Sequence, residues 1–279
     1  MEALDRLRDY RLNSTTEGKL EYVLDEYRCF LEMLEKLTPT RRDAVLRVLA
    51  NNELENNQEM EHEDKFLVQL GLELPGEHKK TSIEVMTDSI LKNEPFNINK
   101  IKQLHRLIIR GTNDDVPRNY GIRDFDTYVC EAVNGVEKVS YTPPSPEEIR
   151  PYLRDLFDFL NETDNDEKNI FTNSILSHFY IAALQPFGNG NTRLARLIEY
   201  GSIFKLSRDI LGSKIKSPAL YASGRYLVYR KQYRDSIANL VACPTDEQYN
   251  KWVDYNLNML DEQLNYSSSR LEEKIKRGF

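Results

Sequence analysis

Two apolar segments joined by a short polar loop constrain the fold of this chain more than any other part of its sequence. Residues 175–184 and 194–206 are rich in apolar side chains, which predicts two buried helices. The loop between them carries one proline, two glycines and two asparagines, residue types that end one helix and allow a turn before the next. We therefore expect two core helices connected by this loop.

The same loop has the features of an anion site. A helix that begins after it presents unpaired N–H groups and the positive end of its dipole. Gly188 and Gly190 would let the backbone approach a phosphate closely. Arg193 and Arg196 lie one helical turn apart, on one face, where both can bind oxyanions. From the residues alone, a loop between core helices whose arginines merely form salt bridges is an equal alternative.

Residues 185–196, QPFGNGNTRLAR, resemble the motif of the Fic family, H-P-F-x-[D/E]-G-N-[G/K]-R-x-x-R. The positions that match are Pro186, Phe187, Gly190, Asn191, Arg193 and Arg196. Gln185 stands where the family has histidine, Asn189 where it has the acid, and Thr192 where it has glycine or lysine. The differences fall on the catalytic chemistry, and the matches fall on the scaffold and the phosphate loop.

The resemblance implies a protein adenylyltransferase, which transfers AMP from ATP to a protein hydroxyl. It assigns the nucleotide to Gly188, Asn189, Gly190, Asn191, Thr192, Arg193 and Arg196. The reaction needs a general base, a metal ion and donors for the oxyanion charge. The amide of Gln185 cannot accept a proton as histidine does, and the neutral Asn189 is a weak Mg²⁺ ligand. We therefore expect ATP as the nucleotide, weak or absent Mg²⁺, and little AMP transfer.

A β-hairpin is predicted within residues 128–142. Asn134-Gly135 lies between two β-prone runs, which is a strong signal for a two-residue hairpin turn. In the Fic family a hairpin at this place is the flap that holds a target segment by strand addition. The resemblance therefore implies a protein target docked on this hairpin.

The N-terminal region reads as amphipathic helices, one rich in apolar residues from Leu20 to Leu34 and another from Arg41 to Asn51. We expect the sequence around Pro39 to separate them, with Thr40 as the cap of the second. Many Fic proteins carry an inhibitory motif resembling [S/T]-x-x-x-E-[G/N]. Here Asn51 stands at its Ser/Thr position, Glu55 at its Glu position and Asn56 at its last position. The resemblance, with this one mismatch at Asn51, implies Glu55 as an inhibitory residue paired with Arg196. A solvated acidic helix face is the alternative for this segment.

The remaining histidines and cysteines fit structural roles better than catalytic ones. His105 resembles a leucine-histidine element upstream of the family motif, and His178 falls in the first apolar segment. His62 and His78 lie in the polar segment 61–99 and are expected on the surface. The cysteines Cys29, Cys130 and Cys243 have no metal-ligand spacing, which favours small buried or half-buried side chains in a reducing compartment.

Together these patterns predict a mainly α fold, a Fic-type helical bundle with one β-hairpin flap and an N-terminal helical annex. We divide it into an N-terminal helical region, 1–95, a core with flap and nucleotide loop, 96–210, and a C-terminal helical extension, 211–279. The extension includes a last amphipathic helix from Gln248 to Leu264, and its tail is expected to fray from Ser267.

Composition excludes several other classes. The net charge of −7 gives no global positive field for nucleic acid. The sequence has no run of 18 apolar residues, so no membrane span is expected, and the charged N-terminal segment does not resemble a secretory signal. We therefore expect a cytoplasmic protein.

Three interpretations stay open from the sequence. The first is a nucleotide-binding Fic-type protein with weak or lost transfer. The second is an active variant that uses a different base or transfers another phosphate-containing group. The third is a non-catalytic interaction module that binds a partner through the hairpin. ATP binding separates the third from the others, and labelling of a protein target separates the first two.

Overall fold

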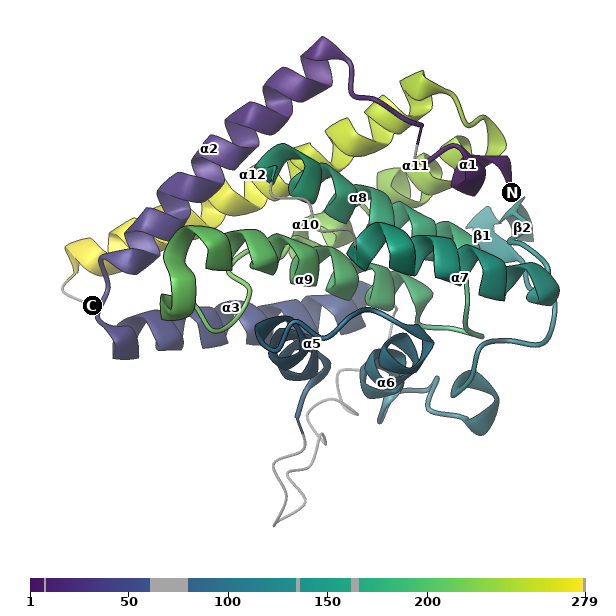
Figure 1. The fold of residues 1–279 in the computed structure, drawn as a ribbon, viewed down its shortest axis with the longest axis horizontal. Coiled ribbons are helices and arrows are strands. Elements are labelled where there is room, and N and C mark those ends of the chain that lie inside the picture. The colour runs from purple at the N-terminus through teal and green to yellow at the C-terminus, as the bar shows by residue number, and fades with distance from the viewer. Residues whose placement is uncertain (8, 61–79, 134–135, 162–165, 278–279) are drawn as a thin grey trace.

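The computed structural model describes residues 1–7, 9–60, 80–133, 136–161 and 166–277. The described part is mainly helical and contains a two-stranded antiparallel sheet, as predicted (Figure 1). Its elements, in chain order, are α1 (Glu2–Asp5), α2 (Ser14–Glu35), α3 (Pro39–Met60), α5 (Ser82–Leu91), α6 (Ile98–Ile109), η1 (Pro117–Asn119), β1 (Val129–Val133), β2 (Val136–Tyr141), α7 (Pro146–Asn161), α8 (Glu167–Leu184), α9 (Asn191–Leu211), η2 (Gly212–Lys214), α10 (Ser223–Val228), α11 (Arg230–Ala242) and α12 (Asp246–Lys276).

Helices α8 and α9 form the centre of the bundle. Every residue of α8 from Ser174 to Leu184 is buried, as is every residue of α9 from Arg193 to Phe204. Figure 1 shows the two helices side by side, with α2 and α12 above them and α5 and α6 below. Pro186, Phe187 and Gly190 of the turn between them are buried as well, whereas Asn189 is exposed.

The C-terminal helix α12 is longer than the sequence predicted. The tail expected to fray from Ser267 is helical to Lys276. Leu264, Ser267 and Leu271 are buried on one face of α12, which packs along α2. Burial of this face stabilises the additional turns.

The N-terminal region also differs from the prediction in detail. Pro39 is the first residue of α3, a position where its missing N–H costs nothing, and α3 continues to Met60 rather than ending at Asn51. Helix α5 was not predicted within the polar segment 61–99. Its signal was present, because Thr81 and Glu84 form a capping box at its start.

The hairpin forms as predicted. Strands β1 and β2 are antiparallel, with Val129 opposite Tyr141 and Cys130 opposite Val139, and a register irregularity lies between these two pairs. The Asn134-Gly135 turn itself lies outside the described residues, and so do His62 and His78. Tyr141, at the end of β2, is buried and donates its hydroxyl proton to the carbonyl of Ala182 in α8, at 2.7 Å. The base of the hairpin is thereby joined to the end of α8.

The three cysteines are free and exposed, which corrects the expectation that they are buried or half-buried. Cys29 lies in α2 and Cys130 in β1, whereas Cys243 follows the end of α11. None of the helices in the described ranges is both long and apolar enough to cross a membrane.

Candidate functional site

The turn between α8 and α9 begins at Gln185, which ends α8 in a left-handed conformation, with φ of 48°. Both polar atoms of the Gln185 side chain are bonded to residues of the two helices that flank the turn. Its Nε2 donates to the carbonyl of Ala182 at 2.7 Å, and its Oε1 accepts from Nδ2 of Asn191 at 2.8 Å. Gln185 therefore braces the turn, and no group able to take up a proton occupies this position.

Asn191 holds the turn from inside and does not face a ligand. Its Oδ1 accepts the N–H of Phe187 at 2.9 Å, and its Nδ2 donates to the carbonyl of Phe187 at 3.0 Å and to Gln185. Both side-chain N–H groups are used in these bonds. This corrects the expectation that Asn191 donates to a phosphate: its burial, at 2% exposure, turns it toward the backbone.

His105 of α6 supports the outer part of the turn. Its ring stacks on Phe187 with centroids 3.7 Å apart, and its Nε2 lies 2.7 Å from the carbonyl of Asn189. That carbonyl can only accept, so Nε2 carries the proton. Burial lowers the pKa of His105 from 6.5 to about 4, although the bond to Asn189 opposes this shift. His105 is therefore a neutral structural group, in agreement with the sequence analysis.

Two glycines of the turn are required by close contacts. Gly190 has φ of +75°, and a Cβ added there would lie 2.8 Å from Cγ2 of Ile109 and 3.2 Å from Nε2 of His105. A Cβ at Gly188 would lie 2.2 Å from Oδ1 of Asn119. The segment that includes η1 thus packs directly on the turn.

Arg193, in the first turn of α9, is 3% exposed and pairs with Asp114, with 2.5 Å between Nη2 and Oδ2. Asn189, at the motif's acid position, donates from Nδ2 to Oδ1 of the same carboxylate at 2.5 Å. The Oδ1 of Asn189 accepts the N–H of Gly190 at 2.8 Å. One backbone donor expected to hold an anion is therefore already satisfied by Asn189. Thr192 is half-buried in this first turn.

Arg196 is fully buried, one turn further along α9. Glu53 and Arg196 both lie close enough to affect the buried hydroxyl of Tyr200. Burial raises the pKa of Tyr200, Glu53 and Glu199 raise it further, and Arg196 lowers it. Glu53 also accepts from the hydroxyl and the N–H of Ser223, at the start of α10.

The prediction that Glu55 pairs with Arg196 is wrong in this structure. Glu55 is exposed on α3, whereas Glu53 is 2% exposed. Two positions apart on a helix, the side chains point to nearly opposite faces. The buried face is the one that packs on α10, where Asn56 lies against Gly224. Glu53 is therefore the acidic residue of α3 that reaches the interior.

Arg123 is a residue whose role the sequence did not reveal. It is 2% exposed, and its guanidinium donates to the carbonyls of Gln185 at 2.7 Å and Phe125 at 2.8 Å, and also to that of Pro144. The N–H of Arg123 donates to the carbonyl of Pro186 at 3.0 Å. Arg123 thus ties both ends of the hairpin to the turn.

His178 lies in the core, behind the turn, as the sequence predicted. Its Nδ1 lies 2.7 Å from Oε2 of Glu199, and its Nε2 lies 2.8 Å from the hydroxyl of Tyr233. All three side chains are buried. The network satisfies polar groups inside the bundle and does not contact the turn residues.

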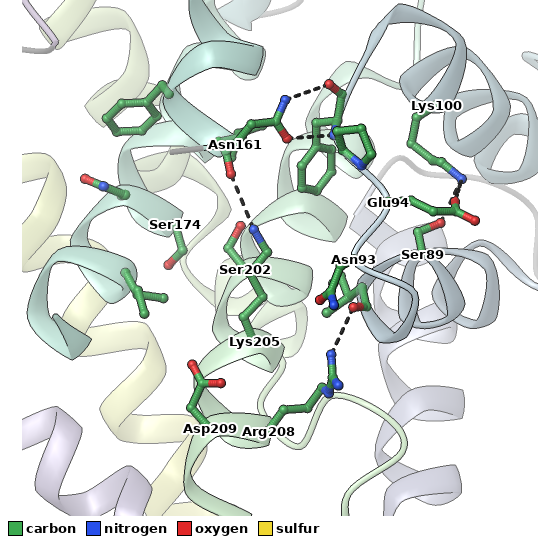
Figure 2. Close-up of a pocket in the computed structure, with 17 residues that line it drawn as sticks. Ser89, Asn93, Glu94, Lys100, Asn161, Ser174, Ser202, Lys205, Arg208 and Asp209 are labelled. Atoms are coloured by element: carbon green, nitrogen blue, oxygen red, sulfur yellow. Dashed lines mark hydrogen bonds and ion pairs between the residues drawn. The ribbon is translucent and has the colours of Figure 1, made fainter. Parts of the chain in front are cut away.

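Two cavities lie away from the two arginines. One, of about 390 Å³, lies at the far end of α9, where Lys205 donates to the carbonyl of Leu160 at 3.3 Å and Arg208 donates to that of Ile90 at 2.9 Å (Figure 2). These two cationic side chains bind carbonyls at the C-terminal ends of α7 and α5, and a third, Lys100, pairs with Glu94. The other, of about 400 Å³, is lined by six residues between 117 and 125: Pro117, Arg118, Gly121, Ile122, Asp124 and Phe125. This second cavity borders the turn, because Phe125 approaches Gly188.

Residues 95–200 match the sequence model of the Fic/DOC family. This part of the chain is a Fic/DOC family domain. The match begins just before α6 and ends within α9, so it contains the hairpin, α7, α8 and the turn.

Two curated relatives are protein adenylyltransferases. The chain is 25% identical over 208 residues to protein adenylyltransferase fic-1 of Caenorhabditis elegans, and 24% identical over the same length to that of Caenorhabditis briggsae. Each alignment covers 69% of this chain and 39% of the relative. The chain thus spans about two-fifths of the length of these relatives.

Solved Fic structures share the fold beyond the matched domain. Residues 134–508 of Fic-1 from C. elegans superpose with a TM-score of 0.60 at 17% identity, over 95% of this chain and 74% of that one. A Fic domain containing signaling protein from Bacteroides thetaiotaomicron gives a TM-score of 0.62 at 17% identity, over 91% of this chain and 98% of the other. The N-terminal and C-terminal helices therefore belong to a known arrangement.

The two glycines with similar φ offer a test of the packing at the turn. We expect Gly190→Ala to lower the free energy of unfolding by about 2–4 kcal/mol, because it adds a steric clash to the cost of a left-handed alanine. Gly111→Ala, where φ is +76° and no atom lies within 4 Å of the added Cβ, should cost only about 1 kcal/mol. Urea denaturation of the two variants measures the cost of the left-handed alanine (Gly111→Ala) and that cost together with the steric clash (Gly190→Ala). Equal losses would show that the turn has room for a side chain.

The buried neutral state of His105 makes stability depend on pH. The unfolded chain takes up a proton near pH 6.5, whereas the folded protein does so near its pKa of about 4. Between these values the unfolded state binds more protons, so stability falls as pH is lowered from 6.5 to 4, by about 3 kcal/mol in all. His105→Gln, which keeps a donor but cannot titrate, should remove this part of the slope. Denaturant midpoints at pH 7 and pH 5 test it, and parallel profiles would contradict the assignment.

Proposed function

We propose that this chain is a nucleotide-binding Fic-domain protein in which AMP transfer from ATP to a protein hydroxyl is weak or lost. Two arginines at the start of α9, 3% and 0% exposed, lie beside a glycine-containing turn. The similarity to protein adenylyltransferases supports ATP as the nucleotide. The cavity lined by residues 117–125 adds a hollow of ordinary ligand-pocket size beside the turn.

The bonding of Gln185 is the observation that carries the proposed loss of transfer. A general base must be free to take a proton from the attacking hydroxyl, and its loss costs about 10² to 10⁴ in rate. Both polar ends of Gln185 are instead committed to the turn. His105, the histidine in contact with the turn, uses Nε2–H for Asn189 and is stacked on Phe187, so it does not replace the base.

The residues present do not fit a Mg²⁺ ion at the motif's acid position. The amide oxygen of Asn189 accepts the Gly190 N–H, and its amide nitrogen faces Asp114. Among the described residues, no group of three or more His, Cys, Asp or Glu could hold a metal ion. We therefore derive no step through a metal and propose nucleotide binding that depends weakly on Mg²⁺.

A binding module that acts through the hairpin is the second candidate. The two-stranded sheet leaves strand edges open, and Tyr128 and Val139 are 60% and 50% exposed. An extended peptide can add to such an edge by main-chain hydrogen bonds, with side-chain contacts for selectivity. This proposal is compatible with the first, because Tyr141 and Arg123 join the hairpin to the turn.

Nucleotide binding should depend on Arg193. In calorimetric titration with ATP, we expect Arg193→Ala to weaken binding by about 10- to 150-fold, which corresponds to loss of one charge-assisted interaction of about 1.5–3 kcal/mol. Arg270→Ala is the matched control, since Arg270 is 66% exposed on α12. Equal affinity of the Arg193 variant and the parent would disprove the phosphate assignment, and a strong increase of affinity with Mg²⁺ would contradict the metal argument.

Transfer should return when the missing groups are restored. With ATP radiolabelled in its α-phosphate, which stays with the transferred AMP while pyrophosphate leaves, we expect little or no labelling by the parent chain. We expect labelling of the chain itself or of lysate proteins by the Gln185→His, Asn189→Asp double variant. Because Glu53 is the buried acid that α3 places near Arg196, Glu53→Ala should increase that labelling, whereas Glu55→Ala should not. Labelling by the parent would favour an active enzyme with another base. Absence of labelling from a restored variant that binds ATP would favour the binding module.

A further inference from the structure

The carboxylate of Asp114 is bonded to Arg193 and Asn189, two residues that the proposed function assigns to the nucleotide. Its Oδ2 is 2.5 Å from Nη2 of Arg193, and its Oδ1 is 2.5 Å from Nδ2 of Asn189. A phosphate oxygen approaching Arg193 would meet this carboxylate. Two negative groups beside one guanidinium repel each other, so the carboxylate and the phosphate compete for it.

This pair differs from an ordinary surface salt bridge. The side chain of Arg193 is 3% exposed and that of Asp114 is 16% exposed. Exposed ion pairs contribute little, because water and salt screen them, whereas shielded charge-assisted bonds are stronger. The Asp114 carboxylate therefore competes strongly with any other anion for the Arg193 guanidinium.

Neighbouring residues fix Asp114 in this place. Nδ2 of Asn119 donates to the backbone carbonyl of Asp114 at 2.9 Å, and the backbone N–H of Asp114 donates to Oγ1 of Thr112 at 3.2 Å. Asn119 in turn packs on Gly188, where a side chain would not fit. The segment that carries Asp114 is thus held against the turn itself.

Asn189 makes the arrangement possible. Its amide nitrogen is a donor to Asp114, which a carboxylate at position 189 could not provide. An aspartate there would place two carboxylates in contact and expel one of them. The difference between Asn189 and the acid of the Fic motif therefore has a specific physical consequence in this chain: it retains Asp114.

We propose that Asp114 is an internal substitute for a nucleotide phosphate, held on Arg193 by Asn189, and that an anionic ligand binds only after displacing it. The inference rests on the proposed nucleotide function. It concerns Arg193 and a residue of the segment before the hairpin, and it is separate from any role of Glu53 on α3.

The test is calorimetric titration with ATP in the presence of EDTA, which removes any contribution from metal ions. We expect Asp114→Asn to bind ATP at least tenfold more tightly than the parent, because asparagine keeps the shape and loses the charge. Asp115→Asn is the matched control. Asp115 carries the same charge one residue away but accepts from the N–H of Gly111 and the hydroxyl of Tyr120, both at 2.8 Å. It should bind ATP as the parent does.

Other results would overturn the proposal. Equal affinity of Asp114→Asn and the parent would mean that the carboxylate does not compete. Weaker binding by Asp114→Asn, together with Mg²⁺-dependent binding by the parent, would make Asp114 a metal ligand instead. If Asp115→Asn also bound ATP more tightly than the parent, the tighter binding by Asp114→Asn would be explained by the loss of one negative charge and not by the contact with Arg193. If Asp114→Asn does not fold, Asn189→Ala tests the same contact: it removes the amide donor that holds the Asp114 carboxylate against Arg193, so this variant should also bind ATP more tightly than the parent.

A second probe separates this inference from the proposed function. Inorganic pyrophosphate should raise the melting temperature of Asp114→Asn more than that of the parent. If ATP binds to neither protein but pyrophosphate stabilises Asp114→Asn alone, the nucleotide function is wrong and the internal anion stands. If pyrophosphate stabilises the two proteins equally, or neither of them, the internal anion is wrong, whether or not ATP binds.

Discussion

The turn between α8 and α9 joins two largely buried helices, and those of its polar backbone groups that are buried have to find partners inside the protein. Asn191 satisfies Phe187 from within, His105 satisfies Asn189 from α6, and Arg123 satisfies Gln185 and Pro186 from the base of the hairpin. The position of α6, the hairpin and the first turn of α9 relative to one another depends on these bonds.

The same enclosure controls the charges. Arg193 and Arg196 are almost free of solvent, and buried charges are stable only near opposite charges. Asp114 lies against the first arginine, and Glu53 and Glu199 affect the same buried tyrosine as the second. The nucleotide site proposed above therefore already contains a carboxylate, with which a ligand would compete as well as with water.

The two residues that differ from the Fic motif at its histidine and acid positions both make specific hydrogen bonds in this chain. Gln185 replaces a group that takes up protons with an amide that donates to Ala182 and accepts from Asn191. Asn189 replaces an acid with an amide that donates to Asp114. Each amide donates from its side-chain NH₂ group. The acid of the motif has no such donor when it is ionised, and the histidine of the motif would present a ring N–H in a different position. Both amides thereby stabilise the observed turn, and under the proposed function this leaves the site without a base and without a charged metal ligand.

The sequence by itself determined the helical class, the hairpin, the two core helices and the turn with its arginines, because hydrophobic periodicity and turn residues are local signals. The missed helix α5 also had a local signal, in its capping box. Only the tertiary structure decided which residues meet the turn. Asp114 reaches Arg193 across 79 positions of sequence, Arg123 reaches Gln185 across 62, and Glu53 reaches Ser223 across 170. Tertiary structure also decides which of Glu53 and Glu55 reaches the interior. Both are acidic residues of one helix, and packing of α3 on α10 decides which of them is buried.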